Sequence, residues 1–77
     1  MNNTRRAAVR KASKLTHEAY SLIEYAYGEE EECLNNIPEN LSNTSRYEKM
    51  EEYVELLEEA MDQLETACDA VDQILGI

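Results

Sequence analysis

The 77-residue sequence contains no Phe and no Trp, one Pro, two Gly and two Cys, and it has no long hydrophobic run. The cysteines, Cys33 and Cys68, are too few for a disulfide framework and lack zinc-site spacing. No apolar run approaches the roughly 20 residues of a membrane-spanning helix, and the first 15 residues lack the apolar segment of a secretory signal. The scarcity of Gly and Pro argues against a β-sandwich with frequent turns. We therefore expect no membrane association and a reducing cytoplasm.

Basic residues are also scarce. Seven Lys and Arg stand against 17 Asp and Glu, which gives a net charge of −10. Phosphates repel such a chain, so direct nucleic-acid binding is not expected. The basic start of the chain, which has no acidic residue before Glu18, is typical of the first stretch of a helix, and organellar transit peptides share its style. One small domain over residues 1–77 fits the length, and a self-contained enzyme does not.

Apolar residues in the second half of the chain recur in alternating steps of four and three, which is typical of an amphipathic helix that packs on another helix. Eight successive positions follow this rule: Met50, Val54, Leu57, Met61, Leu64, Cys68, Val71 and Leu75. A second stripe at intervals of seven lies beside them: Tyr53, Ala60, Ala67 and Ile74. Together the two stripes make this helix apolar over a wider surface than a contact with one other helix needs.

The first half repeats the pattern with smaller side chains. The same stepping picks out Ala8, Ala12, Leu15, Ala19, Leu22 and Ala26, and a flanking stripe holds Val9, Thr16 and Ile23. We predict that the alanine-rich stripe is the contact with the second helix, because small side chains let two helices approach closely. Gly28 costs about 1 kcal/mol inside a helix, but the stripe resumes at Cys33, so a continuous helix is expected.

A polar linker separates the two halves. Pro38 cannot continue a helix, and Ser45 with Glu48 forms an S-x-x-E capping box at the start of the next one. We therefore predict a helix over about 4–35, a loop over about 36–44 in which Ile37 and Leu41 fold over the end of the apolar contact, and a helix over about 45–75. The fold class is all-α, an antiparallel two-helix hairpin that resembles a coiled coil.

Antiparallel packing pairs residues whose numbers sum to about 82. Cys33 then lies near Lys49 and Cys68 near Lys14, and the two thiols are about 27 Å apart at 1.5 Å per residue, which excludes an intrachain disulfide. Both cysteines are expected to act as small core residues. An isolated hairpin leaves one stripe uncovered, so a homodimer that forms a four-helix bundle is expected. The predicted core and oligomer contacts are Leu15, Leu22, Ile23, Tyr53, Val54, Leu57, Met61, Leu64, Val71 and Ile74.

Negative charge is concentrated near the linker. Residues 24–59 contain twelve acidic residues and two basic ones, a net charge of −10, whereas the other end of the hairpin is compensated. Carboxylates spaced by three and four residues lie about 5–6 Å apart on a helix. The candidate residues for binding a basic partner are Glu29, Glu30, Glu31, Glu32, Glu48, Glu51, Glu52, Glu55, Glu58 and Glu59. A solubilising outer face is the alternative interpretation.

No motif for catalysis, metal binding or a cofactor stands out. The single His17 has no Glu-x-x-His partner, and the run Glu29–Glu32 lacks the ligand spacing of an EF-hand. A Cys68–His17 dyad for nucleophilic catalysis is disfavoured because Cys68 lies in the predicted helix contact. We therefore expect no enzyme activity, no metal and no cofactor.

The linker also carries a family resemblance. Residues 36–51 read NIPENLSNTSRYEKME, which resembles the linker N-L-P-E-x-L-x-x-S-E-R-x-E-x-M-E of small acidic helical-hairpin proteins from bacteriophages and mobile elements of Gram-positive bacteria. Ile37 and the Thr44-Ser45 pair depart from that pattern. The resemblance implies a helical hairpin and a phage setting in the cytoplasm of a bacterial host cell. Small acidic phage proteins often inhibit host nucleases, anti-CRISPR proteins included.

Two functions follow from these features. The first is a non-enzymatic protein-binding module that occupies a basic surface of a nucleic-acid-handling protein by mimicking nucleic acid. The alternative is a structural, homo-oligomeric helical bundle whose acidic face only confers solubility.

Overall fold

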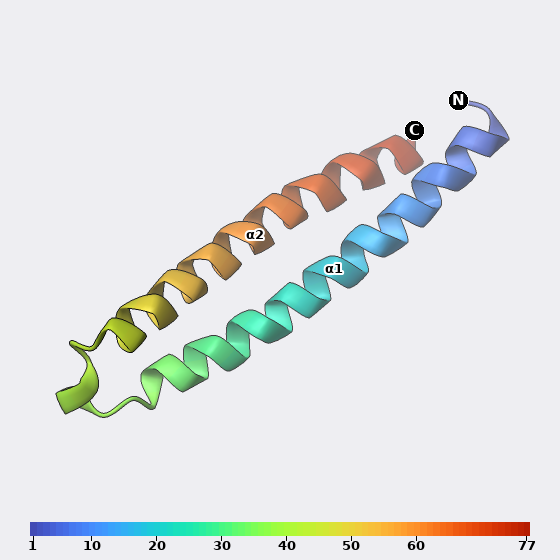
Figure 1. The fold of residues 1–77 in the computed structure, drawn as a ribbon. Coiled ribbons are helices and arrows are strands. Elements are labelled where there is room, and N and C mark those ends of the chain that lie inside the picture. The colour runs from blue at the N-terminus through green and yellow to red at the C-terminus, as the bar shows by residue number, and fades with distance from the viewer.

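The computed structural model describes all 77 residues as two long antiparallel helices (Figure 1). Helix α1 spans Asn3–Asn35, a short 3-10 turn spans Glu39–Leu41, and helix α2 spans Ser45–Gly76. The molecule is a rod with extents of 60 × 15 × 14 Å, and both termini lie at the end opposite the loop. The predicted all-α hairpin is confirmed, and the predicted helix bounds agree within one residue.

Local sequence explains where α1 begins and ends. The Asn2 side chain caps the helix by accepting a 2.8 Å hydrogen bond from the backbone N–H of Arg5. At the other end, the Asn36 N–H donates to the Glu32 carbonyl, and Pro38 follows two residues later. Gly28 lies inside α1 with a negative φ, so the helix continues through it as predicted.

Helix α2 is capped one residue earlier than predicted. Thr44, not Ser45, is the N-cap, and its hydroxyl accepts a 3.2 Å hydrogen bond from the Tyr47 N–H. The preceding turn fixes this choice, because both the N–H and the hydroxyl of Thr44 donate to the Leu41 carbonyl. Ser45 is already helical, so the predicted capping box with Glu48 is wrong.

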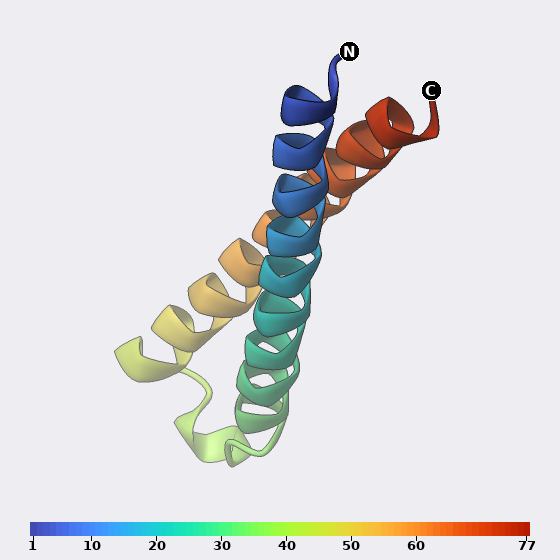
Figure 2. The ribbon, with the colours of Figure 1, turned by 90° about the vertical axis from the view of Figure 1, so that its right-hand side faces the viewer.

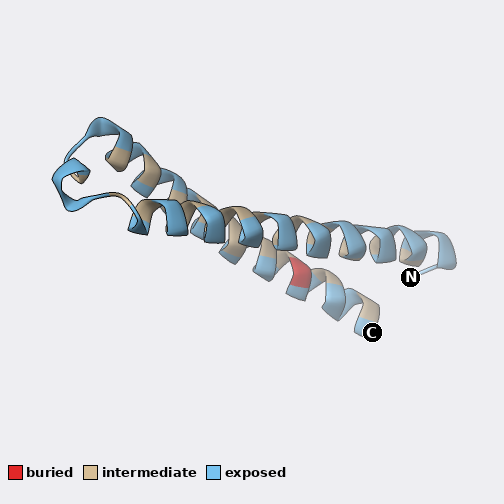
Figure 3. Cartoon of the chain, turned by 90° about the horizontal axis from the view of Figure 1, so that it is seen from below, coloured by how far each residue is buried: buried red, intermediate tan, exposed pale blue.

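The contact surface of α2 is the predicted one. All eight positions of its main stripe are buried or half-buried. Cys68 is the one buried residue of the chain, with 5% of its surface exposed, and Figure 3 shows a single short buried segment while the rest of both helices is half-buried or exposed. Figure 2 shows that the two helices cross instead of running side by side along their whole length.

The contact surface of α1 differs from the predicted one. Leu15 and Leu22 are 53% and 69% exposed, and Ala8 and Ala12 are exposed as well. Ala19 and Ala26 of the predicted stripe are half-buried, and so are residues of a second stripe: Val9, Ser13, Thr16, Tyr20, Ile23, Tyr27 and Leu34. Two stripes of α1 share the same periodicity, and the one with branched and aromatic side chains packs on α2, since it covers more apolar surface than alanine does. We call this stripe and its α2 counterpart the seam.

The register is also shifted slightly. Interhelical hydrogen bonds join Arg6 to Leu75, Ser13 to Asp72 and His17 to Asp72, whose numbers sum to between 81 and 89. Cys68 therefore lies beside His17 and Tyr20, not beside Lys14 and Leu15. Cys33 is exposed, which corrects its assignment to the core, and both thiols are free.

Candidate interaction surfaces

The outer face of α2 carries a row of carboxylates that we call the acidic ladder: Glu48, Glu51, Glu52, Glu55, Glu58 and Glu59. All six side chains are exposed. No Lys or Arg nitrogen lies within 4 Å of their carboxylate oxygens. The Gln63 amide donates to Glu59 at 3.2 Å. The ladder is therefore a negative surface that the chain itself leaves almost uncompensated.

The four consecutive glutamates of α1 do not belong to the same surface. Successive helix residues point about 100° apart, so Glu29 and Glu32 are exposed while Glu30 and Glu31 are half-buried. Glu30 lines two surface grooves beside Tyr53 of α2. The ten predicted partner-binding carboxylates thus divide into the α2 ladder and a run that winds around α1.

Glu31 has a specific partner on its own helix. The Tyr27 hydroxyl donates a 2.7 Å hydrogen bond to the Glu31 carboxylate. This hydrogen bond, helped by partial burial and by the negative charge of Glu31, raises the pKa of Tyr27 to about 12. Burial and the nearby carboxylates of Glu24 and Glu65 raise the pKa of Tyr20 as well. Tyrosine hydroxyls in the seam therefore stay protonated over the physiological range.

An apolar surface lies on one side of the hairpin, which we call the apolar face. It consists of exposed or half-exposed residues from both helices: Ala8, Ala12, Leu15, Ala19, Leu22 and Ala26 of α1 with Tyr53, Leu56, Ala60, Ala67, Ala70 and Ile74 of α2. Tyr53, Leu56 and Ile74 are 50%, 52% and 38% exposed. Sequence reasoning identified every member except Leu56 and Ala70, but it placed the α1 members in the hairpin contact.

Both helices contribute to the same side. A surface groove of about 370 Å³ is lined by Ala26 of α1 together with Tyr53, Leu56 and Leu57 of α2. The residues of this face share one position: each comes directly before a seam residue. On α1 these include Ala12, Ala19 and Ala26, and on α2 they include Tyr53, Ala60, Ala67 and Ile74. In an antiparallel pair, such residues of the two helices flank the seam on the same side. The apolar face is therefore continuous across both helices.

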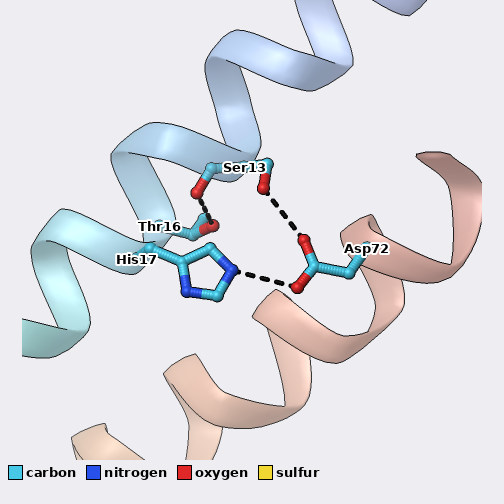
Figure 4. Close-up of polar contacts among 4 residues, drawn as sticks. All are labelled: Ser13, Thr16, His17 and Asp72. Atoms are coloured by element: carbon cyan, nitrogen blue, oxygen red, sulfur yellow. Dashed lines mark hydrogen bonds and ion pairs between the residues drawn. The ribbon is translucent and has the colours of Figure 1, made fainter. Parts of the chain in front are cut away.

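The opposite side of the seam is polar. Asp72 of α2 accepts a 2.9 Å hydrogen bond from the Ser13 hydroxyl and lies 3.0 Å from Nε2 of His17, as Figure 4 shows. These two hydrogen bonds, Ser13 first, lower the pKa of Asp72. The carboxylate lies between the hydroxyl and the imidazole, so the ring makes no hydrogen bond with Ser13. This order differs from a catalytic triad, in which the histidine contacts the nucleophile. The three residues join the helices.

The loop end has an apolar groove of about 550 Å³ lined by residues that include Cys33, Ile37, Pro38, Leu41 and Met50. Ile37 is half-buried there, as expected, and Leu41 remains 46% exposed. No group of three or more His, Cys, Asp or Glu side chains is arranged to hold a metal ion. Neither helix has a segment long and apolar enough to cross a membrane.

Comparisons with protein-family models, with curated proteins and with solved structures found no match to this chain.

Proposed function

We propose that this chain is a non-enzymatic protein-interaction module whose acidic ladder binds a basic surface of a nucleic-acid-handling protein. The observation that carries the proposal is the set of six exposed ladder carboxylates with no basic side chain within 4 Å. A helix presents them at a spacing of about 5–6 Å. Duplex DNA likewise presents a dense array of phosphates on a rigid rod. A groove built to hold phosphates would accept such a ladder.

The proposed mechanism is competition for that groove. Ladder carboxylates would replace phosphates on Lys and Arg side chains, and the long-range field of a −10 chain would speed the encounter. Binding of this kind weakens with salt, because the exposed charges are screened. The family resemblance of the linker adds a phage setting inside a bacterial host cell, with a nuclease or a CRISPR effector as the target class.

The test compares two variants of equal charge. The ladder variant carries Glu51→Gln, Glu55→Gln and Glu58→Gln, and the control carries Glu18→Gln, Glu39→Gln and Asp69→Asn, which are exposed residues outside the ladder. Proteins captured from host lysate by the wild type should be released by added duplex DNA and lost with the ladder variant, while the control retains them. Equal capture by both variants, or capture insensitive to DNA, would contradict the proposal.

A second candidate function is a structural homodimer with a four-helix core, and the apolar face favours it. Exposed contiguous apolar surface on a small protein marks an interaction site. In this candidate the ladder is the solubilising outer surface of the bundle. Sedimentation equilibrium tests it directly: the bundle requires a mass of about twice 8.9 kDa, and a monomer at millimolar concentration would eliminate it.

A further inference from the structure

The surface area of the free hairpin indicates that a partner covers part of it. The chain exposes 5962 Å², whereas a folded monomer of 8.9 kDa is expected to expose about 4,800 Å². The excess is about 1,200 Å², and one partner in a standard interface buries about 800 Å². With a single buried residue, the hairpin has almost no core of its own. The area available therefore matches what a stable dimer requires.

We infer that the apolar face binds a second copy of this chain in an antiparallel orientation, with the two loops at opposite ends of the dimer. This inference rests on the second candidate function and adds its geometry. A two-fold axis perpendicular to the rod would place α1 of one copy against α1 of the other, and α2 against α2. Every neighbouring pair of helices in the resulting four-helix bundle then runs antiparallel.

Charge selects this orientation over the parallel one. Residues 24–59 carry −10, and the rest of the chain is neutral. A parallel dimer would lay two such segments side by side, which costs free energy through like-charge repulsion. The antiparallel dimer instead places each acidic segment beside the compensated end of its partner.

The spacing of small and large residues on α1 fits the same arrangement. When two α1 helices run antiparallel with facing numbers that sum to 34, Ala12 faces Leu22 and Leu15 faces Ala19. Each leucine then meets an alanine, so the two surfaces interdigitate. The same register brings Arg5 opposite Glu29 at both ends of the contact. Both are exposed and neither has an ionic partner within its own chain.

Sedimentation equilibrium with matched variants tests the surface. Leu22 and Tyr25 are both 69% exposed on α1, but only Leu22 belongs to the apolar face. Leu22→Ser should convert the dimer to a monomer, whereas Tyr25→Ser should leave it dimeric. Circular dichroism of both variants verifies that the helices persist. Equal effects of the two substitutions would overturn the assignment of the surface.

Cross-linking tests the orientation. In a Cys33→Ser background, Arg5→Cys and Glu29→Cys proteins are mixed and treated with a short bis-maleimide. The antiparallel dimer yields the mixed 5–29 product and little 5–5 or 29–29 product, since equal positions lie at opposite ends. A parallel dimer would set α1 of one copy against α2 of the other and separate position 5 from position 29 of the partner by most of the length of α1. A dimer that yields no 5–29 product therefore overturns the orientation. A monomeric wild type overturns the dimer itself, and neither outcome affects the proposed role of the acidic ladder.

Discussion

His17 of α1 and Asp72 of α2 lie 3.0 Å apart, Nε2 to Oδ2, in a hydrogen bond that joins the two helices. Both side chains are about half exposed, so the contact is modest in strength. Its location matters more than its strength, because it lies on the polar side of the seam, near the end where the chain begins and ends. Together with the Ser13 hydroxyl it fixes how α1 and α2 face each other there.

The Asp72 contact should make stability depend on pH. Its folded pKa is lowered by Ser13 and His17, so its contribution is present above the unfolded pKa and is lost as the pH falls through the folded value. Asp72→Asn should lower the urea midpoint at neutral pH, and this effect should shrink as the pH falls below the usual value of 3.8. Asp69→Asn is the control, an exposed neighbour without a hydrogen bond to α1. Identical pH profiles for the two variants would contradict this prediction.

Tyr27 should ionise late. Its pKa is raised to about 12 by the hydrogen bond to Glu31. A raised folded pKa stabilises the fold below the unfolded value of 10.0, and this contribution is lost as the pH rises through about 12. Glu31→Gln should lower the Tyr27 pKa towards 10.0, while Glu32→Gln on the exposed face should not. Tyrosinate absorbance measured against a Tyr27→Phe reference separates this residue from the other four tyrosines.

The start of α2 provides a test of the cap. Thr44→Ala should lower the free energy of unfolding by about 1 kcal/mol, because the Tyr47 N–H loses its acceptor. Ser45→Ala should change it by less than about 0.5 kcal/mol, since Ser45 is a helical residue without a capping bond. Urea denaturation of both variants measures these free energies of unfolding. A larger decrease for Ser45→Ala than for Thr44→Ala would show that Ser45 is the N-cap, as the sequence predicted.

Gly28 should tolerate a side chain. A Cβ at this position meets no atom within 4 Å, and its φ is negative. Gly28→Ala should therefore raise the free energy of unfolding by about 0.5–1 kcal/mol, as expected for the middle of an exposed helix. Gly76→Ala, at the last residue of α2 where helices fray, should raise it less. Destabilisation by Gly28→Ala would show that α1 bends or ends there.

Substitutions at two neighbouring residues of α1 should distinguish the stability of the hairpin from its dimerisation. Ile23 is half-buried in the seam, whereas Leu22 is 69% exposed. At dilute, monomeric concentration, Ile23→Ala should cost about 1–2 kcal/mol and Leu22→Ala much less. At high concentration the melting temperature of the Leu22→Ala variant should not depend on protein concentration, because the variant no longer dimerises. A larger cost of Leu22→Ala in the monomer would place the alanine-rich stripe in the seam after all.

Hydrophobic periodicity predicted the two helices and the α2 side of the seam because no second pattern competed with the one that was used. Pro38 ended one helix, and only one stripe of α2 held large apolar residues throughout, from Met50 to Leu75. On α1 two stripes share the same step, and hydrophobic pattern alone does not rank them. Aromatic and hydroxyl side chains distinguish the stripe of α1 that packs on α2. Tyr20 and Tyr27 are half-buried in the seam, and the Ser13 hydroxyl donates a hydrogen bond to Asp72 across it.

The candidate surfaces were predicted in part. The ladder of α2 followed from helical spacing, because every member has another member three or four residues away and all six are exposed. The run Glu29–Glu32 does not join this surface, because four consecutive residues wind about 300° around a helix and cannot share one face. The α1 half of the apolar face was not predicted as an exposed surface, because the sequence pattern placed Leu15 and Leu22 in the seam, whereas both are exposed.

The chain enters and leaves the rod at the same extremity (Figure 1), and the rod is 60 Å long. An affinity tag, fluorophore or sensor surface attached through either terminus is therefore held at the compensated end. The acidic loop end then projects into solvent, far from the point of attachment. Proteins tagged at either terminus should be interchangeable in binding assays, and immobilisation itself should not mask the ladder.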